Sequence, residues 1–318
     1  MLGLFGLLIA ANAAAGAWAL AAFHDRPALL GTSLLAWSLG LRHAVDADHI
    51  AAIDNVTRKL MQEGRQPLTV GLFFALGHST VVALASAGLA AAVPLLGDRL
   101  DVVSRIGGTV GALVSVFFLL VIAAYNFVVV RSLWLGQAPE VDGGPLTRLG
   151  RPLFGLIARP WHMYLLGALF GLGFDTATEV ALLGLSASQA AQGMSPWTIL
   201  VFPALFAAAM ALVDTADGVL MNRAYGWALA RPERRSTYNL AVTLVSVVVA
   251  VGVAGLVLLG LVSDRWGRSG GFWDTIAGLN DNADGVGLVI VGVFVAMWIG
   301  AAVLYRATRP QQGGAAAD

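Results

Sequence analysis

The chain has 318 residues, of which 58% are hydrophobic and only 12% are charged, and its formal net charge is zero. A soluble protein of this composition would expose long apolar runs to water, so a soluble globular domain is excluded and lipid is the expected solvent. The neutral balance gives no indication of nucleic acid as a partner. Cysteine is absent, which excludes disulfides and thiolate metal ligands.

Apolar segments long enough to cross a bilayer, at about 20 residues each, recur along the chain. They lie at about residues 2–22, 30–57, 67–96, 104–130, 160–190, 197–222, 239–263 and 285–305. The sequence therefore predicts an all-α, polytopic integral membrane protein with about eight transmembrane helices. The first segment has the small residues of a signal-peptide cleavage site, but it lacks a basic flank and is long, which favours a retained helix.

The connecting segments predict orientation and organisation. Thirteen basic residues fall in loops on one side and five on the other, so the excess of arginine and lysine predicts that both termini are cytoplasmic. Residues 137–159 are rich in glycine, proline and arginine and predict a cytoplasmic linker. The linker separates helices 1–4, within residues 1–136, from helices 5–8, within residues 160–309. Residues 310–318 have the composition of a disordered tail.

Ionisable side chains lie inside four of the predicted spans, where they are costly. Insertion scales give about 2.5–3.5 kcal/mol for each charged residue at the bilayer centre, so these groups need partners. They are Arg42, His43, Asp46, Asp48, His49 and Asp54 on the second span, His78 on the third, Asp175 and Glu179 on the fifth, and Asp214 and Asp217 on the sixth.

The second span cannot avoid its charged motif. The apolar run from Ala28 to Leu41 has about 14 residues, roughly 21 Å at 1.5 Å per residue, which is shorter than a hydrocarbon core of about 30 Å. Either a continuous helix carries part of the motif into the bilayer, or the helix is re-entrant or broken. Arg42 and Asp46, four residues apart, could instead form an ion pair within one helix, with the histidines as structural hydrogen bonders.

An ideal helix places His43, Asp46, His49 and Asp54 on one face, and Asp48 points away from it. Asp48 then requires local unwinding, or it acts from another side, for example by orienting a histidine. Imidazoles with carboxylates and without thiolates suit nickel, cobalt, zinc or copper(II), and argue against copper(I).

The third, fifth and sixth spans bring further polar groups to similar depths. His78 alone would suggest a structural hydrogen bond, but its level beside the second-span cluster favours a functional role. Asp175 and Glu179 are four residues apart, and Asp214 and Asp217 are three apart. Like charges at these spacings repel unless a cation or a proton lies between them, although protonated carboxyls bonded to hydroxyls are an alternative.

Four motifs resemble those of the nickel/cobalt permease family, NiCoT. They are Arg42-His43-Ala44-Val45-Asp46-Ala47-Asp48-His49-Ile50, the segment 73–82 around His78, the segment 172–179 that ends in Glu179, and the segment 206–218 that contains Asp214 and Asp217. Ala209 is a departure, because the family usually has glycine there. The resemblance implies secondary transport of nickel(II) or cobalt(II) as substrate, in the direction of uptake across the cytoplasmic membrane and without ATP hydrolysis. It also implies that His43, Asp48 and His49 are the residues most needed.

The sequence thus predicts a multi-pass permease of the cytoplasmic (inner) membrane, with a metal ion and the lipid bilayer as partners, no resident cofactor and no enzymatic activity. His43, Asp46, Asp48, His49 and His78 are expected to hold the metal. The residues expected to provide an ion pathway or charge balance are Arg42, Asp54, Asp175, Glu179, Asp214 and Asp217. A nickel/cobalt efflux permease is the alternative, and an intramembrane metalloenzyme is disfavoured because no His-Glu-x-x-His motif is present. The sequence leaves the oligomeric state open.

Overall fold

The computed structural model describes the chain except for residues 97–99, 136–156, 173–176, 230–231 and 308–318. The described part is helical and contains no strand, which confirms the all-α prediction. Its elements are α1 (Leu2–Phe23), α2 (Pro27–His43), α3 (Ala47–Gln62), α4 (Val70–Leu96), α5 (Leu100–Trp134), the 3₁₀ turn η2 (Pro160–His162), α7 (Met163–Phe170), α8 (Ala177–Ala191), α9 (Pro196–Ile199), α10 (Val201–Leu229), α11 (Pro232–Trp266), α12 (Gly271–Asp281) and α13 (Ala283–Ala307).

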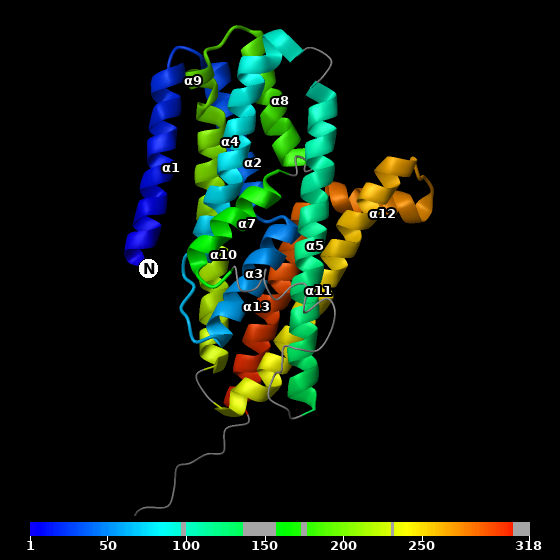
Figure 1. Ribbon diagram of the computed structural model, residues 1–318. Helices are drawn as coiled ribbons and strands as arrows, with labels where there is room; N and C mark the ends of the chain where they lie inside the picture. Colours follow the sequence, from blue (N-terminus) through cyan, green and yellow to red (C-terminus); the bar gives the residue numbers. More distant parts are fainter. Residues whose placement is uncertain (97–99, 136–156, 173–176, 230–231, 308–318) are drawn as a thin grey trace, which may run out of the picture.

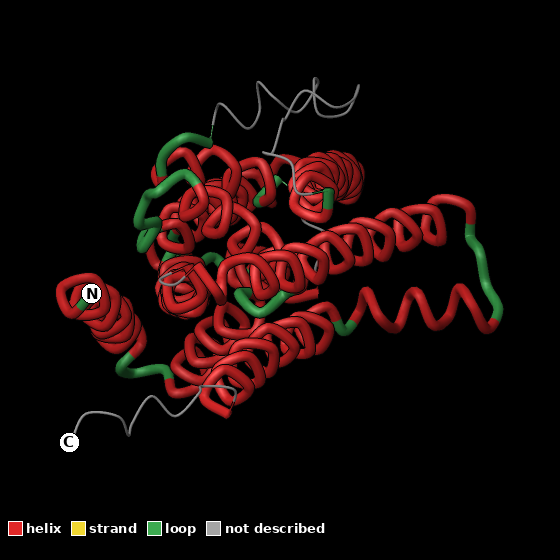
Figure 2. Tube along the Cα trace, turned by 90° about the horizontal axis from the view of Figure 1, so that it is seen from below, coloured by secondary structure: helices red, strands yellow, loops and turns green. Residues whose placement is uncertain are grey.

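The long helices run side by side along one axis of the molecule (Figure 1). Helix α10 packs against α1, α2, α3 and α4, while α5 and α11 pack against each other. Helix α1 lies at the edge of the bundle. The end of α11 and the short helix α12, which the sequence did not predict, project together to one side in both views (Figure 1 and Figure 2).

Within the described residues, five helical segments are long and apolar enough to cross a membrane. They are Leu2–Phe23, Val70–Ala91, Pro196–Gly226, Leu240–Trp266 and Ala283–Ala301. Each coincides with a predicted span, so the chain has the build of a multi-pass membrane protein. The count of eight spans and the cytoplasmic placement of both termini stay predictions, and the predicted linker and tail lie almost wholly outside the described residues.

The second and fifth predicted spans are not continuous helices. Helix α2 ends at His43 and α3 begins at Ala47, with Asp46 in an extended conformation (φ −61°, ψ 144°) between them. The fifth span is divided into α7 and α8, and residues 173–176 between them are outside the described part. The charged motif therefore does not lie on one ideal helix. Of the two alternatives that the sequence left open, the broken helix is the one observed.

Glycines bring α4 close to two neighbouring helices. A Cβ at Gly71 would overlap the backbone of α10, and one at Gly77 would overlap the backbone of α7. Gly167 on α7 is in turn pressed against the backbone of α4. In lipid, where apolar burial does not drive helix association, such small residues allow close van der Waals packing. They fix α4, which carries His78, between α7 and α10.

Candidate metal centre

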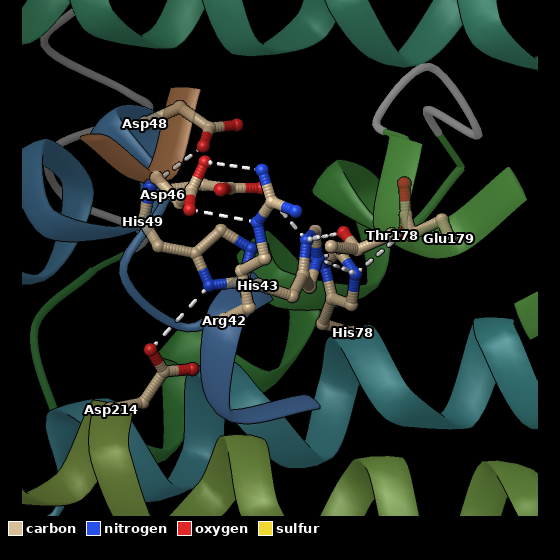
Figure 3. A network of polar contacts seen from close by, with 10 residues as sticks. Arg42, His43, Asp46, Asp48, His49, His78, Thr178, Glu179 and Asp214 are labelled. Carbon is tan, nitrogen blue, oxygen red and sulfur yellow. Dashed lines mark hydrogen bonds and ion pairs between the residues drawn. The ribbon is translucent and has the colours of Figure 1, made fainter. Parts of the chain in front are cut away.

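Three buried histidines from three helices meet in the interior. His43 is the last residue of α2, His49 lies in the first turn of α3, and His78 lies within α4. Each is at most 2% exposed, and one ring nitrogen from each lies within 4.8 Å of the others. The ring centroids are 4.6–4.9 Å apart. Figure 3 shows the rings close together; they are inclined to one another rather than stacked, and we call them the histidine triad.

The break between α2 and α3 allows His43 and His49 to approach the same residue, His78. Because the chain turns at residues 44–46, His43 at the end of α2 and His49 at the start of α3 both reach His78 on α4. Aromatic rings close the apolar sides of the triad: Phe74 packs edge-on against His49 at 4.8 Å, and Phe206 lies 5.3 Å from His43. The triad is thus held in a dry setting, where electrostatic interactions are stronger than in water.

Two imidazole nitrogens are close enough to share one ion. His43 Nε2 lies 3.0 Å from His78 Nε2. Two cis ligands of a metal with bonds of about 2.1 Å are separated by about 3 Å. Glu179 Oε1 joins the same group, 2.8 Å from His78 Nε2 and 3.8 Å from His43 Nε2. The three atoms could therefore bind one divalent cation.

Carboxylates on the other side of two rings can set the tautomer. Asp46 Oδ2 lies 2.9 Å from His43 Nδ1, and Asp214 Oδ1 lies 3.5 Å from His49 Nδ1. A metal-binding imidazole commonly donates its second N–H to a carboxylate, which leaves the opposite nitrogen free as ligand. Thr178 Oγ1, which the sequence reasoning missed, lies 3.0 Å from His43 Nδ1; its place between Asp175 and Glu179 was the available signal.

Asp48 lies next to His49 in the first turn of α3. Its Oδ1 accepts a hydrogen bond from the backbone N–H of His49 at 2.9 Å, so it satisfies a free donor in the first turn of α3. The described contacts connect Asp48 to the backbone that carries His49. The prediction that it ligates metal stays a prediction.

Arg42 does not form the ion pair within one helix that the sequence allowed. Its Nε and Nη2 donate to the two carboxylate oxygens of Asp284 at 2.7 and 3.0 Å. Asp284 lies in the first turn of α13, and the sequence reasoning missed it, although an acidic residue at the start of the last predicted span was visible. The same turn packs on the α2–α3 break, because a Cβ at Gly287 would overlap the carbonyl of Val45.

The remaining acidic residues lie at different places. Asp54 accepts hydrogen bonds from Tyr225 Oη and, at 3.0 Å, from Ser246 Oγ. Asp217 is buried, at 7% exposed, and makes no hydrogen bond to the triad within the described part of the chain. Asp175 lies outside the described residues. The sequence predicted two acidic pairs, Asp175 with Glu179 and Asp214 with Asp217. The structure brings Glu179 and Asp214 to the histidines.

Comparison with known proteins decides the family. Residues 29–304 match the family NicO, described as high-affinity nickel-transport protein. The chain belongs to the NicO family. This confirms the resemblance to nickel/cobalt permeases seen in the four motifs, and the family is one of transporters rather than enzymes.

Curated members of the NicO family cover nearly the whole chain. The high-affinity nickel transport protein of Cupriavidus necator is 52% identical, over 96% of this chain and 92% of its own length. The hydrogenase nickel incorporation protein HupN of Bradyrhizobium diazoefficiens is also 52% identical, over 95% and 83%. The cobalt transport protein NhlF of Rhodococcus rhodochrous is 40% identical, over 89% and 85%. No solved structure is a significant match.

Proposed function

We propose that this NicO-family chain is a secondary transporter that takes up nickel(II), cobalt(II) or both across the cytoplasmic (inner) membrane. Its relatives are named for the transport of nickel and of cobalt. The observation that carries the proposal is the histidine triad, whose three rings are at most 2% exposed and converge at a helix break. Imidazole and carboxylate donors without thiolate suit borderline divalent metals.

The triad has the features of a transport site rather than of a rigid structural site. Its ligands come from α2, α3 and α4, and two of them lie on opposite sides of the α2–α3 break. Broken helices near the middle of a bundle form the ion sites of many secondary transporters. A site shared among separate segments can be opened by small shifts of any of them.

The other predicted residues take supporting roles in this proposal. Asp46 and Asp214 orient His43 and His49, and Glu179 supplies an oxygen ligand or balances charge at His78. Arg42 neutralises the charge of Asp284 beside the α2–α3 break. Asp48 keeps its expected role as a metal ligand, and the residues left with an ion-pathway role are Asp54, Asp175 and Asp217.

The membrane potential can supply the driving force for uptake. A potential of 100 mV, negative inside, contributes about 2.3 kcal/mol per charge, or about 4.6 kcal/mol for a divalent cation. The sequence contains no P-loop signature, so inward movement of the ion down its electrical gradient is the mechanism proposed.

Radioactive nickel accumulation tests the proposal. Cells that express the protein should accumulate more nickel than cells with empty vector, and His43→Ala or His49→Ala should abolish the gain at equal expression. His24→Ala is the matched control, because His24 is exposed and pairs with Asp25 at a helix end. Wild-type accumulation in both triad variants would refute the site, and a fall in cell nickel on expression would indicate efflux.

A further inference from the structure

A second group of oxygen atoms lies beyond the histidine triad along α3 and α10. Asp217 is 7% exposed, and neither of its carboxylate oxygens has a hydrogen-bond partner among the described residues. A buried carboxylate without partners is costly. A bound cation or a proton would offset this cost. The neighbouring side chains indicate which of the two is bound.

Asp54 lies at nearly the same level as Asp217. The contact between His49 and Asp214 aligns α3 with α10, and the bond between Asp54 and Tyr225 shows that both helices continue in the same direction. At 1.5 Å per residue, Asp54 lies about 7.5 Å beyond His49, and Asp217 lies about 4.5 Å beyond Asp214. The two carboxylates thus differ by about 3 Å along the helix axes.

The two helices touch at this level. A Cβ at Gly218 would lie 3.4 Å from Ile53 Cγ2, so the residues next to the two carboxylates are in van der Waals range. Asp217 interacts electrostatically with Asp54 and with Asp214. Two like charges in a buried setting repel unless a cation or a proton lies between them.

Two hydroxyl groups lie against Asp54. Tyr225 Oη and Ser246 Oγ both donate to Asp54 and come from α10 and α11. Helical side chains lean toward the N-terminus, which is why Tyr225 reaches back to Asp54 from the following turns. Asp54 thus has hydroxyl partners from two other helices, and one of these, α10, also carries Asp217. Carboxylate and hydroxyl oxygens suit hard divalent cations.

Arg58, one turn beyond Asp54, limits how tightly a cation could be held. Its side chain is 2% exposed, and Nη2 donates to Asn55 Oδ1 at 2.7 Å. Nε and Nη1 have no hydrogen-bond partner in the described part of the chain. Arg58 lies one helical turn from Asp54, so its positive charge offsets part of the negative charge there and should weaken cation binding.

We propose that Asp54 and Asp217, with Tyr225 and Ser246, form a second cation site that receives the transported divalent ion from the histidine triad. The inference rests on the proposed function, in which the triad is the first site. A conducting pathway requires binding that is weak enough for the ion to leave. Transfer of the ion from a tight nitrogen site to a weak oxygen site costs binding free energy. The electrochemical gradient of the ion must supply that free energy.

Metal titrations of the purified full-length protein test this site. Nickel(II) calorimetry of the wild type should show a tight step and a weaker one, and manganese(II), followed by electron paramagnetic resonance, should bind at the weaker site. Asp217→Asn should keep the tight nickel step, which also reports correct folding, and should weaken manganese binding by at least about 10-fold. Tyr225→Phe should weaken manganese binding in the same direction, and Asp264→Asn, at an exposed position on α11, should change neither.

The triad and the second site can fail separately. In His49→Ala the tight nickel step should disappear while manganese still binds, and a persisting tight step would refute the triad alone. Manganese binding that is unchanged in both Asp217→Asn and Tyr225→Phe would overturn the second site. Loss of both steps in Asp217→Asn would also overturn it, because a separate site leaves the triad intact.

Discussion

Gly171, directly after α7, touches the backbone of His78, so one added methyl group should displace a triad member. In Gly171→Ala the Cβ would lie 2.8 Å from the carbonyl oxygen of His78 and 3.2 Å from both His78 Cα and Val81 Cβ. Ordinary van der Waals contact begins at 3.4 Å, so α4 and α7 must separate by about 0.6 Å at this point.

The size of the effect follows from that displacement. Binding sites need their ligands within about 0.5 Å of the productive geometry, and a misplacement of about 1 Å can cost about 100-fold. We therefore expect Gly171→Ala to weaken apparent nickel affinity by roughly 10-fold. Overpacking of a close interface should also lower the free energy of unfolding by about 1–3 kcal/mol.

Nickel uptake as a function of concentration, together with unfolding in detergent, checks this prediction. Gly88→Ala is the control on the same helix as His78, because no described atom lies within 4 Å of its Cβ. That variant should transport normally and gain about 0.5–1 kcal/mol from the helix preference of alanine over glycine. A Gly171→Ala protein with wild-type affinity and stability would refute the packing argument.

Four further substitutions test three individual contacts. Arg42→Glu should impair uptake by loosening α13 from the α2–α3 break, and the charge swap with Asp284→Arg should restore part of it; no recovery would show that the ion pair is dispensable. Asp46→Asn should weaken nickel binding by about 10–100-fold, because a neutral amide replaces the carboxylate that raises the basicity of His43; an unchanged affinity in calorimetry would contradict this. Glu179→Gln should retain binding with lower affinity, and equal affinity for nickel would exclude it as a ligand.

The membrane character and the gathering of polar groups could be predicted from the sequence alone. Charged residues in an apolar span need partners because their free energy of insertion is unfavourable. The similar depths of His43, His49 and His78 in their spans therefore predicted that they lie together in the interior. The apolar run from Ala28 to Leu41 was too short to cross by itself, which already indicated that the next residues would enter the bilayer or that the helix would break.

The position of the break could not be predicted, because residues far along the chain determine it. Segment 44–46 contains neither proline nor glycine, and its only local signal is Asp46, a residue type favoured at helix N-caps. The turn is supported instead by the start of α13, through the Arg42–Asp284 ion pair and the close approach of Gly287 to Val45. The prediction that Asp46 shares a face with the histidines and that Asp48 points away assumed one ideal helix. That assumption does not hold for the broken helix.

Anomalous diffraction at the nickel edge, on crystals of the protein loaded with nickel, tests the central claim most directly. We expect the strongest anomalous peak between the imidazoles of His43, His49 and His78, at about 2.1 Å from their nitrogens. A strongest peak elsewhere, for example at the exposed His24–Asp25 pair, with no density in the triad, would contradict the account.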